Sequence, residues 1–219
     1  MDAELISDLF VLVCTAVGFI YGTRVFLTTR APLYTKMITG AVGCSMLGRL
    51  LVVIHDLLGT FGSGFKFSVL GCAGAFLFLF TANAGLMDEL ADDGNAQYAK
   101  YRRMSLWAPV VAFLLDVPIV LSASPVTVKV SYVVASLVIA AASFFNLKHA
   151  MFSNAEFGVV SCVSDYNLCA LAYAFLHMDE MVALSFDATI AVVATRFFVG
   201  IVSLLIPIML KKGIDKWQM

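Results

Sequence analysis

Seven long apolar segments follow one another along the chain, and they limit its fold more than any other feature. They cover residues 5–27, 37–58, 65–86, 106–122, 128–147, 157–176 and 186–210. Each is close to the roughly 20 residues that a helix needs to cross a bilayer, where every backbone amide must be satisfied within the segment. Because 61% of the 219 residues are hydrophobic and only 13% are charged, a soluble fold of this size is excluded. We predict an all-α integral membrane protein, a single seven-transmembrane-helix bundle over residues 1–219.

The positions of lysine and arginine predict the orientation of this bundle. Only Lys66 and Lys129 fall on one side of a seven-span arrangement. Ten fall on the other side: Arg24, Arg30, Lys36, Lys100, Arg102, Arg103, Lys148, Lys211, Lys212 and Lys216. Short cytoplasmic loops hold an excess of these residues, so we expect the N-terminus outside and the C-terminus in the cytoplasm. Residues 177–180 are acidic and are interpreted as an outer loop. The expected location is the plasma membrane, which in a bacterial cell is the inner membrane.

Ionisable residues inside the apolar segments are the first candidates for function. Arg49, Asp116, Asp165 and Arg196 qualify by their distance from the segment ends. Holding a charge at the centre of a membrane helix costs at least about 2.5–3.5 kcal/mol, so such residues are rare and face other protein groups. We therefore expect Arg49 and Arg196 to point into the bundle, with Asp116 or Asp165 among their partners.

Polar residues share helical faces with these charges, because residues three, four or seven apart lie on one side of a helix. Ser45, Arg49 and Asp56 align within 37–58, and Thr189, Arg196, Gly200 and Ser203 align within 186–210. In 128–147 the aligned set is Tyr132, Ser136, Ser143 and Asn146. The segment 157–176 is the most polar of the seven, with Ser161, Ser164, Asp165, Tyr166 and Asn167 close together.

These observations favour a protein that binds, and translocates, a small polar or anionic solute or an ion. The site is expected among 37–58, 106–122, 157–176 and 186–210. Its candidate residues are Arg49, Asp116, Asp165, Asn167, Arg196, Ser45, Ser161, Ser164 and Tyr132. One alternative is that the charges are structural ion pairs that fix how the helices register. Another is a receptor-like sensor that signals through its cytoplasmic loops to a partner protein or a second copy.

Other classes have less support in the sequence. There is no nucleophile with a base beside it and no catalytic residue that we can name, so an enzyme is not expected. The histidines and cysteines show no spacing typical of metal or haem ligands, and we expect neither a metal nor a cofactor. A net charge of -1 gives no attraction to nucleic acid. The partner that the composition requires is the lipid bilayer.

The predicted topology resembles that of microbial rhodopsins, which hold retinal on a lysine in the last helix. Here the centre of 186–210 carries Arg196, and Lys211 and Lys212 lie only beyond its end, so no retinal is expected. SWEET-type sugar transporters resemble the chain in the number and orientation of spans. Their recurring proline in the first helix of each half has no counterpart in 5–27 or 128–147.

Overall fold

The computed structural model describes residues 3–27, 31–59, 68–88, 94, 96–152 and 163–218, and these residues are almost entirely helical. The main helices are α1 (Ala3–Gly22), α2 (Leu33–Leu58), α3 (Ser68–Thr81), α5 (Ala99–Ser105), α6 (Trp107–Leu121), α7 (Val126–Met151), α9 (Ser164–Ser185) and α10 (Thr189–Gln218). Two π-helical segments, η1 (Thr23–Leu27) and η2 (Ala82–Met87), continue α1 and α3, and a 3-10 helix, η3 (Ala96–Tyr98), precedes α5.

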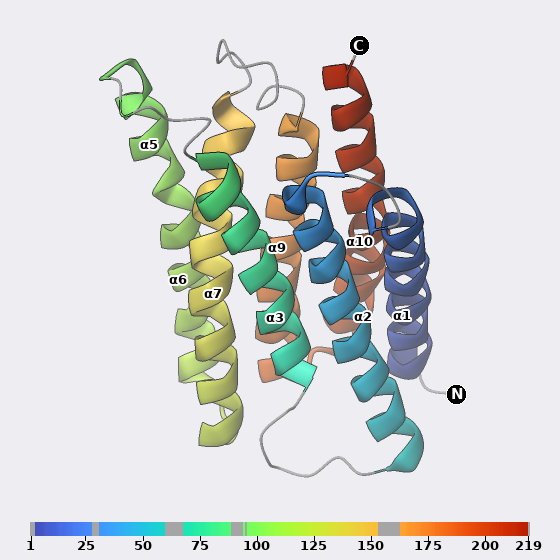
Figure 1. Cartoon of the computed structure of the whole chain (residues 1–219). Coiled ribbons are helices and arrows are strands. Elements are labelled where there is room, and N and C mark those ends of the chain that lie inside the picture. Colours follow the sequence, from blue (N-terminus) through green and yellow to red (C-terminus); the bar gives the residue numbers. More distant parts are fainter. Residues whose placement is uncertain are drawn as a thin grey trace.

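Seven helical segments within these residues are long and apolar enough to cross a membrane, as the sequence predicts. They are Ala3–Leu27, Leu33–Leu58, Val69–Met87, Ala99–Leu121, Val126–Met151, Ser164–Ser185 and Thr189–Lys216. The two ends of the chain lie at opposite ends of the bundle (Figure 1). We call the end where α1 begins, α2 ends and α9 turns into α10 the N-terminal face, and the opposite end the C-terminal face.

Six of the seven membrane-length segments form a closed ring, and the seventh, which contains α5 and α6, lies outside it. In the ring, α1, α2, α3, α7, α9 and α10 each pack against the next, and α10 closes on α1. Helix α6 packs against α7 and α9 (Figure 1). The interior of the bundle is therefore bounded by the six ring helices, and α6 covers the outside of two of them.

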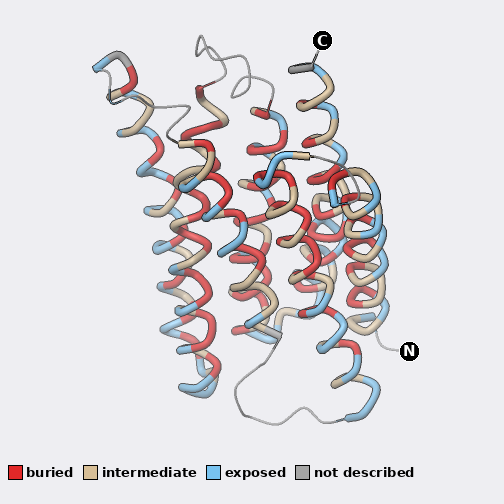
Figure 2. The backbone as a smooth tube through the Cα atoms, viewed as in Figure 1, coloured by how far each residue is buried: buried red, intermediate tan, exposed pale blue. Residues whose placement is uncertain are grey.

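The burial of α6 confirms its outer position. Its buried residues, Ala108, Ala112, Asp116 and Ile119, recur every three or four positions and so form one narrow stripe. The opposite side exposes large apolar side chains, with Leu121 77% exposed. Outward-facing apolar residues of this kind recur around the bundle, where Figure 2 colours them pale blue. Such a surface suits contact with lipid, because an apolar belt in water would be an aggregation site.

The structure corrects the end of the sixth predicted segment. Helix α9 begins at Ser164 and ends at Ser185, whereas the sequence predicts 157–176 followed by an acidic outer loop. The expected loop, residues 177–180, is part of the helix. The polar residues of α9 give it the lowest mean hydropathy of the seven segments, which is why its sequence pattern there is typical of a loop. Their polar groups are satisfied by other helices, as described below, so the helix continues through them.

Helices α2 and α3 approach closely where two glycines face each other. A Cβ atom on Gly71 would lie only 2.4 Å from the Cα atom of Gly48. A side chain at this crossing would force the two backbones apart, since small residues are what allow such an approach between membrane helices. The crossing lies next to Arg49, and it therefore fixes the depth and direction of that residue.

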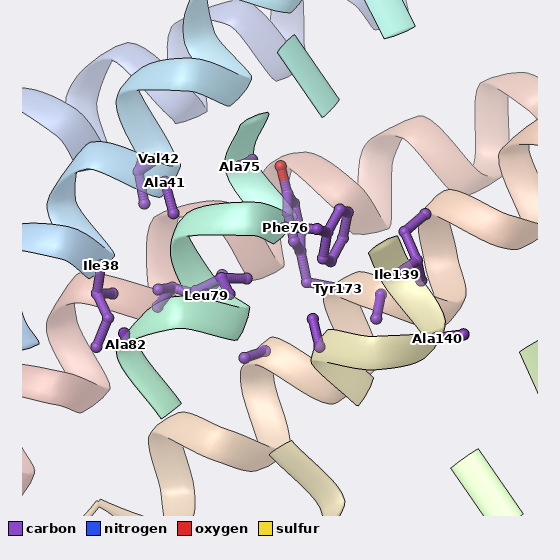
Figure 3. Packing of buried hydrophobic residues seen from close by; sticks show 14 of the residues in the cluster. Ile38, Ala41, Val42, Ala75, Phe76, Leu79, Ala82, Ile139, Ala140 and Tyr173 are labelled. Carbon is purple, nitrogen blue, oxygen red and sulfur yellow. The ribbon is translucent and has the colours of Figure 1, made fainter. Parts of the chain in front are cut away.

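An apolar layer fills the bundle beneath this crossing. Figure 3 shows Ile38 and Ala41 of α2, Phe76 and Leu79 of α3, and Ile139 of α7, together with other buried residues. Phe76 also contacts Tyr173 of α9, with ring centroids 5.5 Å apart. This apolar layer separates the polar groups of the N-terminal face from those of the C-terminal face.

Candidate functional site

Four buried charges from four helices form a closed network. The guanidinium of Arg49 on α2 donates to Asp8 of α1 at 3.1 Å and to Glu180 of α9 at 2.7 Å. Its second terminal nitrogen also bonds to Glu180. The guanidinium of Arg196 on α10 contacts Asp8 at 2.7 Å and Glu180 at 2.9 Å. Each arginine thus pairs with both carboxylates, and we call these four residues the charge ring.

The charge ring is electrically balanced and almost fully buried. The side chain of Asp8 is 1% exposed, and that of Glu180 is 7% exposed. Two guanidinium groups and two carboxylates cancel, which is how a low-dielectric interior tolerates four charges. Because its members come from α1, α2, α9 and α10, the ring also fixes the relative positions of these four helices.

The close packing of α10 against α1 places Arg196 in the charge ring. A Cβ atom on Gly200, one turn further along α10, would lie 2.8 Å from the ring of Phe10 on α1. The absence of a side chain at Gly200 therefore lets α1 and α10 pack tightly beside Asp8. At the other end of the same contact, α9 turns into α10 within a few residues. Asp187 has a φ of 51° in this turn, a left-handed conformation that aspartate tolerates better than most residues.

A cavity of about 830 Å³ lies against the charge ring. It extends from the first residues of α1 and the α9–α10 turn, at the N-terminal face, inward to Ser45 of α2 and Ala135 of α7. Its described lining comes from α1, α2, α3, α7, α9 and α10, and therefore from all six ring helices. Both arginines of the charge ring face this space.

The inner end of the cavity is made of aromatic and polar side chains. His177 lies one turn before Glu180 on α9, and its Nδ1 is 3.8 Å from that carboxylate, too far for a hydrogen bond. The imidazole packs against Tyr173 and Phe76, with centroid distances of 4.4 and 5.6 Å. The hydroxyl of Tyr173 is hydrogen-bonded to Ser45. These groups cap the apolar layer on the cavity side.

A second polar cluster lies on the other side of the apolar layer. Asn83 in η2 donates to Asn146 of α7 and to Asn167 of α9, the latter at 3.1 Å. It also accepts a hydrogen bond from the hydroxyl of Tyr34 at 3.1 Å. We call Asn83, Asn146 and Asn167 the asparagine cluster. All three side chains are fully buried. With the hydroxyl of Tyr34, their hydrogen bonds link α2, α3, α7 and α9 in the half of the bundle nearer the C-terminal face.

Beyond this cluster, a salt bridge closes the C-terminal face. Lys148 of α7 pairs with Asp88 at 2.7 Å, and His149 lies 3.2 Å from the same carboxylate oxygen. Burial raises the pKa of Asp88, but the hydrogen bonds and charges of His149 and Lys148 outweigh it, so the net pKa of Asp88 is lowered. This carboxylate therefore stays charged and holds the end of α7.

The structure brings four of the sequence-predicted site residues to the cavity. Arg49, Arg196, Ser45 and Tyr132 all line it. The predicted shared face of Ser45, Arg49 and Asp56 is confirmed, because all three lie in the lining. The expectation that both arginines point into the bundle and are paired is likewise confirmed.

Other predicted residues lie elsewhere, and the predicted partners of the arginines are wrong. Asp116 of α6 accepts a hydrogen bond from Ser136 at 2.6 Å and is not in the lining. Asp165 is 63% exposed at the start of α9 and lies 3.9 Å from Lys212. Ser164 donates to the backbone of Ala150, and Asn167 belongs to the asparagine cluster. Ser161 falls outside the described residues.

The predicted contribution of the fourth segment also needs correction. No described residue of α6 lines the cavity, because α7 and α9 stand between that helix and the interior. Helix α1 contributes instead, through residues that include Glu4 and Asp8.

Asp8, Glu180 and His177 were missed as site residues because each lies near a segment end. Asp8 lies close to the start of the first apolar segment, and Glu180 lies in the acidic stretch that the sequence pattern predicts as a loop. One signal could have found them: two arginines inside apolar segments require two acids, and a long arginine side chain reaches towards the nearer membrane surface. Acids one or two turns inside a segment at that surface are therefore the natural partners.

The described residues contain no group of histidine, cysteine and carboxylate side chains placed to hold a metal ion. The arrangement as a whole, seven membrane-length apolar helices around a charged interior cavity, is that of a multi-pass membrane protein. No protein-family model matches the chain, and neither a curated protein nor a solved structure matches it. The site itself must therefore support any statement of function.

Proposed function

We propose that this protein binds a small polar solute in the cavity and carries it across the membrane. The observation that supports this proposal is a cavity of about 830 Å³ bounded by four buried charges in a membrane-length bundle. Small-molecule sites commonly have volumes of about 300–1,000 Å³ and a few convergent polar groups. Intramembrane ionisable residues are candidates for a solute path by default.

The charge ring can couple binding to helix movement. Each of its members belongs to a different helix, and each carboxylate is shared by two arginines. A solute that bonds to one member changes the balance of all four pairs. A ligand shifts a conformational equilibrium only through such a difference in contacts between states. The ring therefore links the positions of α1, α2, α9 and α10 to the binding of a solute.

Translocation is favoured over binding alone by the second polar group. The apolar layer that includes Phe76, Leu79 and Tyr173 (Figure 3) lies between the cavity and the asparagine cluster. Asn83 lies within the π-helical segment η2, and π-helical turns are frequent at functional sites because they locally break the regular hydrogen-bond pattern. Movement of α3 at this segment would join the two polar regions into one path.

The second candidate is a sensor, and the one-sided cavity favours it. Within the described residues the cavity extends from the N-terminal face and stops at the apolar layer. A sensor needs to receive its ligand from only one side and to transmit a helix shift to the other face. For both candidates we propose that the N-terminal face is outside the cell, on the basis of the lysine and arginine asymmetry.

Cysteine labelling from the two sides of the membrane separates these candidates. Val52 lines the cavity one turn from both Arg49 and Asp56, so a Val52→Cys variant reports on that space. All five native cysteines are first replaced by alanine or serine. Right-side-out and inside-out vesicles are then treated with a membrane-impermeant thiol reagent. Val134→Cys is the control, because Val134 is 54% exposed on an outward-facing position of α7.

A transporter must expose its cavity to each side in turn, so we expect Val52→Cys to be labelled in both kinds of vesicle and Val134→Cys in neither. Labelling of Val52→Cys from the outside alone would favour the sensor. If Val52→Cys is labelled from neither side, the cavity does not admit solutes and both candidates fail. A reporter fused after Met219 gives the orientation, and we expect it in the cytoplasm.

A further inference from the structure

The charge of the cavity lining points to the class of solute. The described lining contains five carboxylates, Glu4, Asp8, Asp56, Glu180 and Asp187, and two guanidinium groups, those of Arg49 and Arg196. The formal excess is therefore three negative charges. Within the charge ring the charges cancel, so the excess comes from Glu4, Asp56 and Asp187.

These three carboxylates lie outside the charge ring and line the cavity. Within the described part of the chain, none of them forms an ion pair with a lysine or an arginine, although Asp56 interacts electrostatically with Arg196 and Asp8. Glu4 accepts a hydrogen bond from Thr189 at 2.9 Å, which holds it at the junction of α1 and α10. Asp56 lies two turns from Arg49 towards the N-terminal face, and Asp187 lies in the exposed α9–α10 turn. They are therefore distributed around the outer part of the cavity.

The two arginines, by contrast, are already engaged. Each guanidinium contacts both Asp8 and Glu180. An anionic solute would have to compete with two buried carboxylates for the same donors and would leave one of them unpaired, which is costly in a dry interior. The pairing of both arginines therefore disfavours the anionic solute that the sequence left open.

An unpartnered ring nitrogen at the inner end of the cavity is compatible with the same class of solute. His177 lines the cavity, its side chain is 5% exposed, and its Nδ1 has no hydrogen-bond partner among the residues that the structure describes. A neutral imidazole presents one ring nitrogen as an acceptor, and an ammonium group presents only donors. Tyr132 is also among the lining residues, and aromatic side chains attract organic cations.

The same lining argues against a bare metal ion. Although it is rich in carboxylates, the described residues include no group of three or more placed to hold a metal. A cavity of about 830 Å³ is also far larger than one ion needs. A solute with an organic body fits the space, because Leu5, Val52, Val69, Met181 and Leu184 supply apolar lining.

We propose that the cavity selects a positively charged organic solute, a small amine or quaternary ammonium compound, through the carboxylates Glu4, Asp56 and Asp187. This inference rests on the proposed function, since it requires that solutes enter the cavity. It differs from that function in naming the charge of the solute. Acidic clefts concentrate cations by about 10- to 1,000-fold, so the predicted selectivity is large enough to measure.

The test compares two thiol reagents of similar size and opposite charge at the same cysteine. The probes are the trimethylammonium-ethyl and sulfonato-ethyl methanethiosulfonates, each of which transfers its ethylthio group to the thiolate and releases methanesulfinate. Their rates at Val52→Cys, in the cysteine-replaced background, are divided by their rates with 2-mercaptoethanol to remove intrinsic reactivity. We expect the corrected rate to be at least about tenfold higher for the cationic reagent.

Matched variants assign this preference to the carboxylates. Asp56→Asn in the same background is expected to lower the cation preference several-fold. Asp179→Asn is the control, because Asp179 is exposed, lies two residues after His177 on α9 and is not in the cavity lining. It removes the same charge and is expected to leave the preference unchanged. Since neither residue belongs to the charge ring, both variants are expected to keep the wild-type melting temperature, which is measured alongside.

The outcomes separate the inference from the proposed function. Equal corrected rates, or a faster anionic reagent, would overturn the cationic solute while leaving an accessible cavity. An equal loss of preference in Asp179→Asn and Asp56→Asn would also overturn it, because the selectivity would then come from general surface charge. If neither reagent reacts, solute entry itself fails. As a second probe, n-butylammonium should slow labelling by neutral methyl methanethiosulfonate more than butyrate or butyramide does, and the opposite order would contradict the inference.

Discussion

Replacing Arg196 by leucine would leave Asp8 and Glu180 sharing the single guanidinium of Arg49. One of these two buried carboxylates would then lack full compensation, and removing one member of a buried pair costs about 3–5 kcal/mol. For a chain of this length, 1 kcal/mol shifts the melting temperature by about 2–4 °C, so Arg196→Leu is expected to melt about 6–20 °C below the wild type.

A second replacement should reverse most of this loss. Adding Glu180→Leu leaves Arg49 and Asp8 as a neutral pair at 3.1 Å. Exchanging a buried ion pair for apolar residues is often neutral, so the double variant is expected to melt within about 4 °C of the wild type. Glu180→Leu alone leaves two arginines with one carboxylate and should be as unstable as Arg196→Leu.

The assay is thermal unfolding of the purified wild type, the two single variants and the double variant in one detergent. An equivalent cycle on Asp165 and Lys212 is the control, because that pair is 3.9 Å apart with side chains 63% and 70% exposed. Its coupling energy should be at most about 1 kcal/mol. Independent sites add within about 0.5 kcal/mol, so additive losses for Arg196→Leu and Glu180→Leu would refute the charge ring as one energetic unit.

Three other expectations are open to the same thermal measurement. Gly71→Ala should destabilise the protein by about 1–3 kcal/mol, because the added Cβ atom would lie 2.4 Å from the backbone of Gly48. In Gly74→Ala the added Cβ atom meets its nearest neighbour at 3.4 Å, so this variant should cost less than about 0.5 kcal/mol. Equal effects of the two variants would contradict the close helix crossing. Asn83→Leu removes the centre of the asparagine cluster and should cost about 1–3 kcal/mol, since its partners lose their hydrogen bonds while remaining buried; a neutral result would show that the cluster does not stabilise the bundle. The pKa of Asp88 is lowered from its ordinary value of 3.8, so its stabilising effect is present above that value and is lost as the pH falls through the lower folded pKa. The melting-temperature advantage of the wild type over Asp88→Asn should therefore be constant from pH 7 to 5 and shrink below about pH 4. An advantage that grows on acidification would contradict this sign.

The sequence determined the membrane class and the seven helices of this protein for a simple reason. A helix in lipid must satisfy its own backbone and present apolar side chains, so each span leaves a local, contiguous signal about 20 residues long. The inward direction of Arg49 and Arg196 could be predicted on similar grounds, because a guanidinium facing acyl chains has no partner. The shared face of Ser45, Arg49 and Asp56 follows from helical periodicity alone.

Tertiary structure decided which acids pair with these arginines. Asp8 and Glu180 are 172 positions apart in the chain and meet only because α1 and α9 both pack against α10. Asp116 appeared equally suitable by depth, yet it faces Ser136, since the narrow buried stripe of α6 directs it to the outside of α7. The hydropathy of a segment does not indicate which helices will pack against it. The ring order of the helices, and with it the cavity and its excess of carboxylates, therefore emerged only from the packing of the whole bundle.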